Sequence, residues 1–219
     1  MTDVTPLATS YHADDNRGKQ QRLFLAGGKL CLLFALYFLT LFVLMGKALI
    51  AVWMHGEFVS SAQLLVILAL GETLPMSQMI TMSILYGMGR HQASACLALL
   101  DNVVVITLST LLIRGGNLEG TAGLEALCVA VAISAWLIRG VGNMFCGCYF
   151  VDVSVAKYVT GALLPALAAA VLPAAALAAL LAAWKVPGNW FELILCTGYF
   201  TTLYGIACAF LFGSERFKL

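Results

Sequence analysis

Four ionisable side chains lie inside long apolar stretches of this sequence: Lys47, Glu72, Asp101 and Arg139. A charged group in the hydrocarbon part of a membrane costs about 2.5–3.5 kcal/mol on insertion scales, so such residues commonly pair with one another or serve a function. Arginine suits phosphate because its planar guanidinium donates two parallel hydrogen bonds. These four residues are therefore the first candidates for a substrate cavity.

The apolar stretches that carry them have the length of membrane-spanning helices. Of the 219 residues, 62% are hydrophobic and only 11% are charged, whereas soluble domains carry about 25% charged residues. A bilayer-spanning helix needs about 20 mostly apolar residues, and these runs lack the alternation of a transmembrane strand. The sequence thus predicts an all-α, polytopic membrane bundle. Its six helices are predicted over 29–54, 61–88, 93–113, 121–148, 158–184 and 190–212.

Short linkers with Gly, Pro, Asn or charged residues join these helices, the longest being 150–157. If the N-terminus is cytoplasmic, eight basic residues at or beyond the helix ends fall on the cytoplasmic side and two on the outer side. The positive-inside rule therefore predicts that both termini are cytoplasmic. Trp53, Trp184 and Trp190 then lie at outer helix ends, where an aromatic belt is expected. The polar N-terminal segment has neither a signal-peptide nor a transit-peptide pattern.

The depths of the four ionisable residues predict two ion pairs. Asp101 lies about nine residues, or roughly 13 Å, from the cytoplasmic end of its helix, and Arg139 lies at a similar depth on the next helix. Lys47 and Glu72 differ by about 7 Å in depth, which a lysine side chain can cover. Three interpretations remain open. The pairs fix helix register, the two cations attract a pyrophosphate or anionic sugar, or the two acids relay protons or sodium.

Two features of the second predicted helix bear on mechanism. The segment "GMGRHQ" (87–92) follows no strand and lacks the remaining residues of a phosphate-binding loop. We interpret it as a turn, in which Arg90 also meets lipid headgroups or an anionic ligand. Pro75 removes one backbone hydrogen bond and should kink the helix beside Glu72. Such a kink suits either a hinge for alternating access or ordinary helix packing.

No pattern of residues indicates catalysis, a metal site or a cofactor. The seven cysteines lack zinc spacing, Cys146 and Cys148 are too close for a redox motif, and the three histidines are dispersed. Met76, Met79 and Met82 form a stripe that is typical of adaptable packing, although it could also contact a lipid chain. We therefore expect no enzyme activity, no cofactor and no nucleic-acid partner.

Four short groups of residues follow one another along the chain, three of them at or near the ends of predicted helices and one before the first helix. They are Trp53…Gly56…Phe58, Leu85…Gly87…Gly89-Arg90, Gly116…Gly120-x-Ala122 and Thr5-Pro6-Leu7-Ala8-Thr9-Ser10. This order resembles the C-terminal half of polysaccharide flippases in the multidrug/oligosaccharidyl-lipid/polysaccharide exporter superfamily. The resemblance covers nearly the whole chain and is strongest over residues 50–125.

The resemblance implies a polar cytoplasmic segment over 1–28, a four-helix lobe over 29–150, and a terminal transmembrane hairpin with a short tail over 151–219. Such flippases move lipid-linked oligosaccharides across the bacterial inner membrane for lipopolysaccharide and exopolysaccharide synthesis, and their two lobes rock about the substrate. Because only the second lobe is matched, we expect either a fragment or a chain that works with a separate N-terminal lobe or a second copy.

Three other functions remain open. The chain could be a truncated or scaffold membrane protein without transport activity, or part of a multidrug antiporter, because a shared fold does not settle the substrate. A membrane glycosyltransferase would need a loop rich in acidic or basic residues. The longest predicted loop contains a single aspartate, which argues against that enzyme class.

Overall fold

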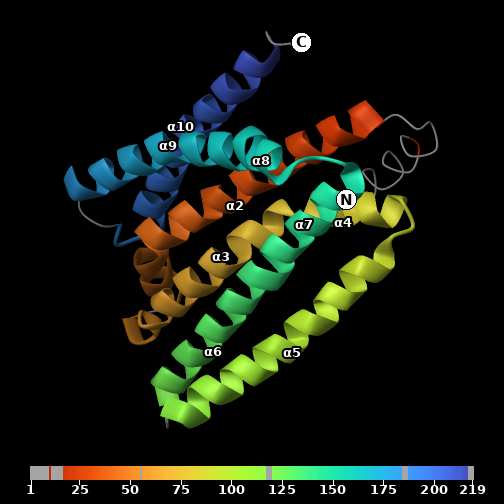
Figure 1. The fold of residues 1–219 in the computed structure, drawn as a ribbon. Helices are drawn as coiled ribbons and strands as arrows, with labels where there is room; N and C mark the ends of the chain where they lie inside the picture. Colours follow the sequence, from red (N-terminus) through yellow and green to blue (C-terminus); the bar gives the residue numbers. More distant parts are fainter. Residues whose placement is uncertain (1–9, 11–16, 55, 117–119, 184–186, 217–219) are drawn as a thin grey trace.

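A computed structural model describes residues 10, 17–54, 56–116, 120–183 and 187–216, and none of these residues forms a β-strand. Six helical spans are long and apolar enough to cross a membrane (Figure 1). They are Arg17–Met54, Ser61–Gly87, His91–Gly116, Gly120–Val151, Val155–Ala183 and Trp190–Gly213. The predicted all-α bundle with six spans is confirmed, and the predicted helices occur in the predicted order.

Three of the six spans are single helices, and three are interrupted. The single helices are α2 (Arg17–Met54), α5 (His91–Gly116) and α10 (Trp190–Arg216). The interrupted spans are α3 (Ser61–Ser77) with α4 (Met79–Gly87), α6 (Gly120–Ser134) with α7 (Asn143–Val151), and α8 (Val155–Tyr158) with α9 (Leu164–Ala183). A π-helical segment, Ala135–Gly142, joins α6 to α7, and another, Val159–Leu163, joins α8 to α9. Such π segments are rare and often occur at functional sites.

The spans pack around α2 and α3, which lie against each other in the centre of the bundle (Figure 1). The span formed by α6 and α7 covers α3, and α5 lies outside that span. Every residue of α5 is described, and Ser94 is the only buried one. Large apolar side chains such as Leu99 and Ile106 are exposed on α5, as expected for a helix that faces lipid.

Two apolar cores hold the bundle together. In the first, side chains of α2, α9 and α10 such as Leu36, Leu177 and Phe200 pack together. The Tyr204 hydroxyl donates a hydrogen bond of 2.6 Å to the Leu33 carbonyl within it. The terminal hairpin is therefore packed onto α2. The second core gathers side chains from α2, α4, α7 and α8 at the other end of the bundle.

The first helix begins at Arg17 rather than at the predicted residue 29. Arginine, lysine and glutamine are favourable in helices, so the polar residues before 29 continue the apolar helix. Its 38 residues are about 57 Å long at 1.5 Å per residue, longer than a hydrocarbon core of about 30 Å. Residues 17–28 are therefore part of the first helix, whereas the sequence predicted that they belong to a polar segment before it.

The loop predicted over 150–157 is reduced to residues 152–154. Asp152 adopts the left-handed conformation (φ 58°) and ends α7. The Ser154 side chain accepts a hydrogen bond of 3.2 Å from the Lys157 N–H and begins α8. A single residue with positive φ and a serine cap therefore complete a turn for which the sequence suggested eight residues.

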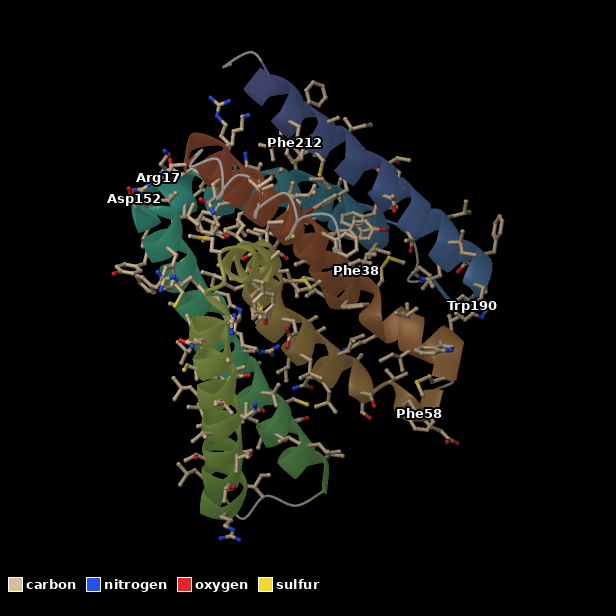
Figure 2. The ribbon with its side chains drawn as sticks, turned by 90° about the vertical axis from the view of Figure 1, so that its right-hand side faces the viewer. Arg17, Phe38, Phe58, Asp152, Trp190 and Phe212 are labelled. Carbon is tan, nitrogen blue, oxygen red and sulfur yellow. The ribbon has the colours of Figure 1, made fainter. Side chains whose placement is uncertain are left out.

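The two ends of the bundle carry different residues. Arg17 and Asp152 meet at one end, with Nη1 and Oδ2 3.9 Å apart, and Phe58 and Trp190 lie at the other end (Figure 2). Trp53 and Trp190 are exposed, as an aromatic belt requires. The third tryptophan of the predicted belt, Trp184, lies outside the described residues.

The turn between α4 and α5 is built on Gly89. Its φ of +70° lies in the left-handed region, which glycine adopts without steric cost. The Arg90 N–H donates to the Leu85 carbonyl at 2.8 Å, and the Gly89 N–H donates to the Tyr86 carbonyl at 3.0 Å. This is the Schellman pattern that ends many helices. The predicted turn is confirmed, and the Arg90 guanidinium lies 5.7 Å from the centroid of the Phe150 ring.

The break between α3 and α4 falls at Gln78, three residues after Pro75. Gln78 has φ −90° and ψ 1°, and its N–H donates to the Pro75 carbonyl at 2.9 Å. Its side-chain amide donates to Ser77 Oγ at 2.8 Å and to the Tyr158 hydroxyl at 3.0 Å, and accepts from Thr81 Oγ1 at 2.9 Å. We refer to Ser77, Gln78, Thr81 and Tyr158 as the Gln78 network. Its side chains are almost completely buried.

Candidate functional site

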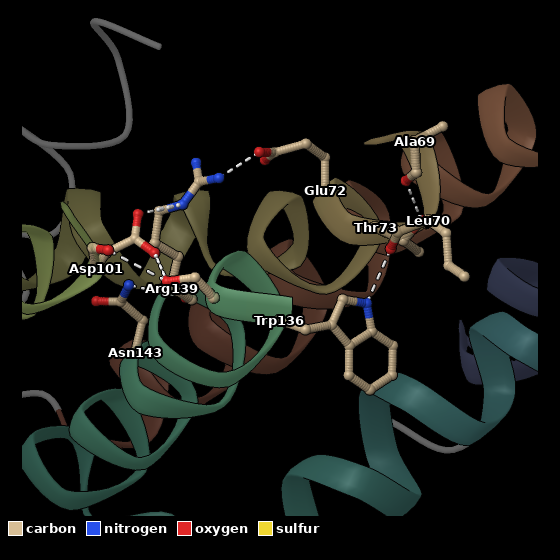
Figure 3. Close-up of polar contacts among 9 residues, drawn as sticks. Ala69, Leu70, Glu72, Thr73, Asp101, Trp136, Arg139 and Asn143 are labelled. Atoms are coloured by element: carbon tan, nitrogen blue, oxygen red, sulfur yellow. Dashed lines mark hydrogen bonds and ion pairs between the residues drawn. The ribbon is translucent and has the colours of Figure 1, made fainter. Parts of the chain in front are cut away.

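Three of the ionisable residues meet where α3, α5 and the π-helical segment Ala135–Gly142 come together (Figure 3). Arg139 Nη2 donates a hydrogen bond to Glu72 Oε1. Arg139 Nε lies 3.1 Å from Asp101 Oδ2, which is an ion-pair distance, but the two atoms are not aligned for a hydrogen bond. We call Glu72, Asp101 and Arg139 the charged triad. Their side chains are 42%, 14% and 36% exposed, respectively.

A buried serine positions the least exposed member of the triad. Ser134 Oγ donates to Asp101 Oδ1 at 2.5 Å, and it also lies 3.2 Å from the Asp101 carbonyl oxygen. Ser134 is completely buried. One carboxylate oxygen of Asp101 is thus hydrogen-bonded, and the other faces Arg139.

Close contact between α3 and α6 brings Glu72 to this site. A Cβ atom on Gly71 would lie 2.6 Å from the Ala132 Cα, so only glycine permits this approach. The Trp136 indole N–H donates to the Leu70 carbonyl at 2.8 Å. That carbonyl is adjacent to the Gly71 carbonyl, whose usual helical donor is absent because residue 75 is proline. The same part of α3 therefore has an irregular backbone and a fixed contact with the neighbouring span.

A cavity of about 230 Å³ adjoins the triad. We call it the triad cavity; it is lined by Glu72, Pro75, Met76, Met79, Met82, Ser94, Ala98, Arg139 and Asn143. Asn143 Nδ2 donates to the Arg139 carbonyl at 2.8 Å. Asn143 Oδ1 and Ser94 Oγ are buried and have no hydrogen-bond partner among the described residues. The cavity thus combines charged groups, unpartnered polar atoms and an apolar wall of methionines.

The structure confirms one predicted ion pair and contradicts the other. Asp101 pairs with Arg139 as predicted. Glu72 also pairs with Arg139, whereas Lys47 is exposed and forms no ion pair with a described residue. The prediction of a Lys47–Glu72 pair is wrong because depth along a helix does not define which way a side chain points. The contact at Gly71 turns this part of α3 towards α6.

The remaining two candidates lie at different places. Pro75 lines the triad cavity close to the helix break. Arg90 is exposed at the turn between α4 and α5 and is not among the cavity residues. The structure therefore brings together Glu72, Asp101, Arg139 and Pro75, and leaves Lys47 and Arg90 apart from them.

Four residues of the site were not predicted: Ser94, Ser134, Trp136 and Asn143. Each is a polar or amphipathic side chain within an apolar run. Asn143 follows Arg139 by four residues, a spacing that places two helical side chains near each other. That signal was available in the sequence. Among the described residues, no three His, Cys, Asp or Glu side chains are grouped as metal ligands.

Comparisons with models of protein families, with curated proteins and with solved structures found no match. The six apolar spans indicate a multi-pass membrane protein. Beyond that class, conclusions about function depend on the chemistry of the triad and its cavity.

Proposed function

We propose that this chain is a transport module of a flippase that moves a lipid-linked oligosaccharide across the bacterial inner membrane for surface polysaccharide. The observation that carries the proposal is the charged triad beside a cavity within the membrane spans. Ionisable residues in such positions commonly mark substrate or ion pathways. Glu72 and Arg139 also lie on interrupted spans, and discontinuous helices are common at transporter binding sites.

The charges of the site favour binding of the sugar and of the phosphates at different places. Arg139 contacts two carboxylates, so the triad has an excess of negative charge and is a poor site for pyrophosphate. Lys47 and Arg90 are exposed cations and are better placed to attract the anionic part. In this proposal the triad cavity accommodates sugar, and the phosphates meet basic residues nearer the ends of the spans.

Transport of the lipid-linked oligosaccharide would require a change in the arrangement of the helices and no covalent chemistry. The regular hydrogen bonding of the α-helix is interrupted at Gln78, whose N–H donates to the Pro75 carbonyl three residues earlier. In this proposal the short helix α4 changes its angle to α3 at this break and carries the α8–α9 span with it, because the Gln78 network ties the two together. Such a change would open the triad cavity to one side of the membrane and then to the other, with both termini in the cytoplasm. A second lobe or a second copy would complete the path.

The proposal can be tested in vesicles that contain the purified full chain and a fluorescent lipid-linked oligosaccharide. A membrane-impermeant quencher reports how fast the lipid reaches the outer leaflet. We expect faster movement than in protein-free vesicles, and about tenfold slower movement when Glu72→Gln, Asp101→Asn and Arg139→Gln are combined, because the charged groups are lost while side-chain size is kept.

Asn102→Leu is the matched control because Asn102 is exposed on α5 and its amide donates to the Ala98 carbonyl at 2.9 Å. It should leave the rate unchanged. The folded chain should be tested alone and together with the protein encoded directly upstream. If neither sample moves the lipid faster than protein-free vesicles do, the proposed function is wrong.

A further inference from the structure

Three buried polar atoms on residues that line the triad cavity have no hydrogen-bond partner among the described residues. One is Arg139 Nε, which lies 3.1 Å from Asp101 Oδ2 in an ion pair. The other two have neither a hydrogen bond nor a counter-ion within the part of the chain that the structure describes. They are Ser94 Oγ and Asn143 Oδ1, on residues that are 3% and 4% exposed. Buried polar groups in native proteins nearly always bond to protein, water or a ligand. Two such atoms at the wall of one cavity therefore indicate that the cavity binds a polar group.

The orientation of the Asn143 amide is defined by its neighbour. Its Nδ2 donates to the Arg139 carbonyl at 2.8 Å, so the unpartnered atom is the oxygen, which can only accept a hydrogen bond. The ligand must therefore supply a donor at this position.

The Ser94 hydroxyl also differs from most hydroxyls in the bundle. A helical hydroxyl commonly donates to a carbonyl one turn earlier. At 2.6–3.2 Å this bond is made by Thr40, Thr73, Ser83, Thr107, Thr110, Thr160 and Thr201. Ser94 does not make this bond, although it is the only buried residue of α5. Its oxygen thus has an unused hydrogen-bonding capacity but is almost completely covered, so a ligand in the cavity would reach it after a shift of neighbouring side chains.

The charge of the site favours a cation. Among the described residues, Glu72 and Arg139 are the only charged ones that line the cavity, and Asp101 contacts Arg139. Two carboxylates therefore face one guanidinium. A ligand that carries one positive charge would balance the excess, whereas an anion would increase it.

The size and wall of the cavity favour an organic body on that cation. The volume of about 230 Å³ greatly exceeds the share of one water molecule, about 30 Å³. Met76, Met79 and Met82 form a flexible apolar wall. Met76 and Met79 also line an apolar groove of about 860 Å³ that includes residues of α2 and α10. The polar cavity and this groove therefore share two methionines as a common wall.

We propose that the triad cavity binds the protonated primary amine of an amino sugar. The ammonium group has three N–H donors, and Glu72, Asn143 Oδ1 and Ser94 Oγ are the acceptors. The sugar ring packs against the methionines. This inference rests on the proposed transport function for its biological role, since the amino sugar would be a unit of the transported oligosaccharide.

The test uses the full chain in lipid nanodiscs and measures the binding of three sugars by calorimetry or ligand-detected NMR. D-Glucosamine carries the charged amine, N-acetyl-D-glucosamine has lost its charge, and D-glucose has a hydroxyl in its place. We expect D-glucosamine to bind at least tenfold more tightly than the other two. Ser94→Ala and Asn143→Leu should each weaken its binding about tenfold, because each removes a hydrogen bond to a charged group.

Two variants control for unspecific effects. Ser83→Ala removes a hydroxyl that donates to the Met79 carbonyl, and Asn102→Leu removes an exposed amide on α5; neither residue lines the cavity. Both should bind D-glucosamine as the unaltered chain does. Equal binding of the three sugars, binding of sodium in place of D-glucosamine, or equal losses in the control variants would overturn the inference.

The two proposals fail in different ways. If D-glucosamine binds as expected but the vesicle assay shows no lipid movement, the transport function is wrong and amine binding stands. If the vesicles move a lipid-linked oligosaccharide without amino groups and D-glucosamine does not bind, transport stands and the amine inference is wrong. The comparison of the three sugars needs no variant, so poor folding of a variant cannot obscure it.

Discussion

The Gln78 network and the residues of the triad cavity both place polar groups on the span formed by α3 and α4. The groups of the network bond to one another, whereas some groups at the cavity have no partner among the described residues. The amide and hydroxyl groups of the Gln78 network bond to one another, and its four residues are at most 1% exposed. The side chains of the charged triad beside the triad cavity are 14–42% exposed. Ser94 Oγ and Asn143 Oδ1 there have no partner among the described residues.

This difference separates two roles for polar groups in an apolar bundle. A network whose members satisfy one another specifies one arrangement of its helices; here it ties the break after α3 to the start of the α8–α9 span. A cluster with unused hydrogen-bonding capacity next to a cavity can instead take up a ligand. We therefore expect the Gln78 network to govern stability and the triad cavity to govern binding.

The largest effect is expected from Arg139→Gln. It leaves the carboxylates of Glu72 and Asp101 without their shared counter-charge and should lower the free energy of unfolding by about 2–3 kcal/mol. This lies between the values for exposed and for fully buried ion pairs, because the groups are partly exposed. Thermal unfolding in detergent, monitored by tryptophan fluorescence, would measure the loss. Adding Asp101→Asn to Arg139→Gln should restore most of it. An unchanged unfolding temperature in the single variant would show that the ion pairs do not stabilise the fold.

A smaller loss, of about 2 kcal/mol, is expected from Gln78→Leu, because Thr81 and Tyr158 lose their buried partner. Tyr158→Phe removes one hydroxyl and should cost about 1 kcal/mol. Both changes should leave the affinity for D-glucosamine within twofold of the unaltered chain, since neither residue lines the triad cavity. If Gln78→Leu weakens this binding as much as Asn143→Leu does, the two clusters do not have separate roles.

Features that depend on distance along the chain were predictable from sequence. The six spans follow from the fixed rise of a helix and the thickness of a bilayer. The same arithmetic placed Asp101 and Arg139 at one depth, and the structure joins them. The Gly89 turn was also predictable, because a helix commonly ends at a glycine with positive φ.

Features that depend on the direction of a side chain around its helix were not predictable. The choice of Arg139 over Lys47 as the partner of Glu72 follows from the backbone contact between Gly71 and Ala132. The Gln78 network needs Tyr158, which is 80 residues away in sequence. Ser94 carries no local signal either, since its importance lies in a hydrogen bond that it does not make.

The smallest effect, and the most direct test of the comparison, comes from two matched serines. Ser77→Ala removes a hydroxyl of the Gln78 network that donates to the Leu74 carbonyl at 2.6 Å and accepts from Gln78, so it should cost about 1 kcal/mol. Ser94→Ala removes a hydroxyl without a partner and should leave stability unchanged or raise it by up to about 1 kcal/mol. Saturating D-glucosamine should then stabilise the unaltered chain more than Ser94→Ala, because a ligand stabilises in proportion to the logarithm of its affinity. If Ser94→Ala loses as much stability without ligand as Ser77→Ala does, the Ser94 hydroxyl is bonded within the protein, and the distinction between a closed network and an open site is wrong at this residue.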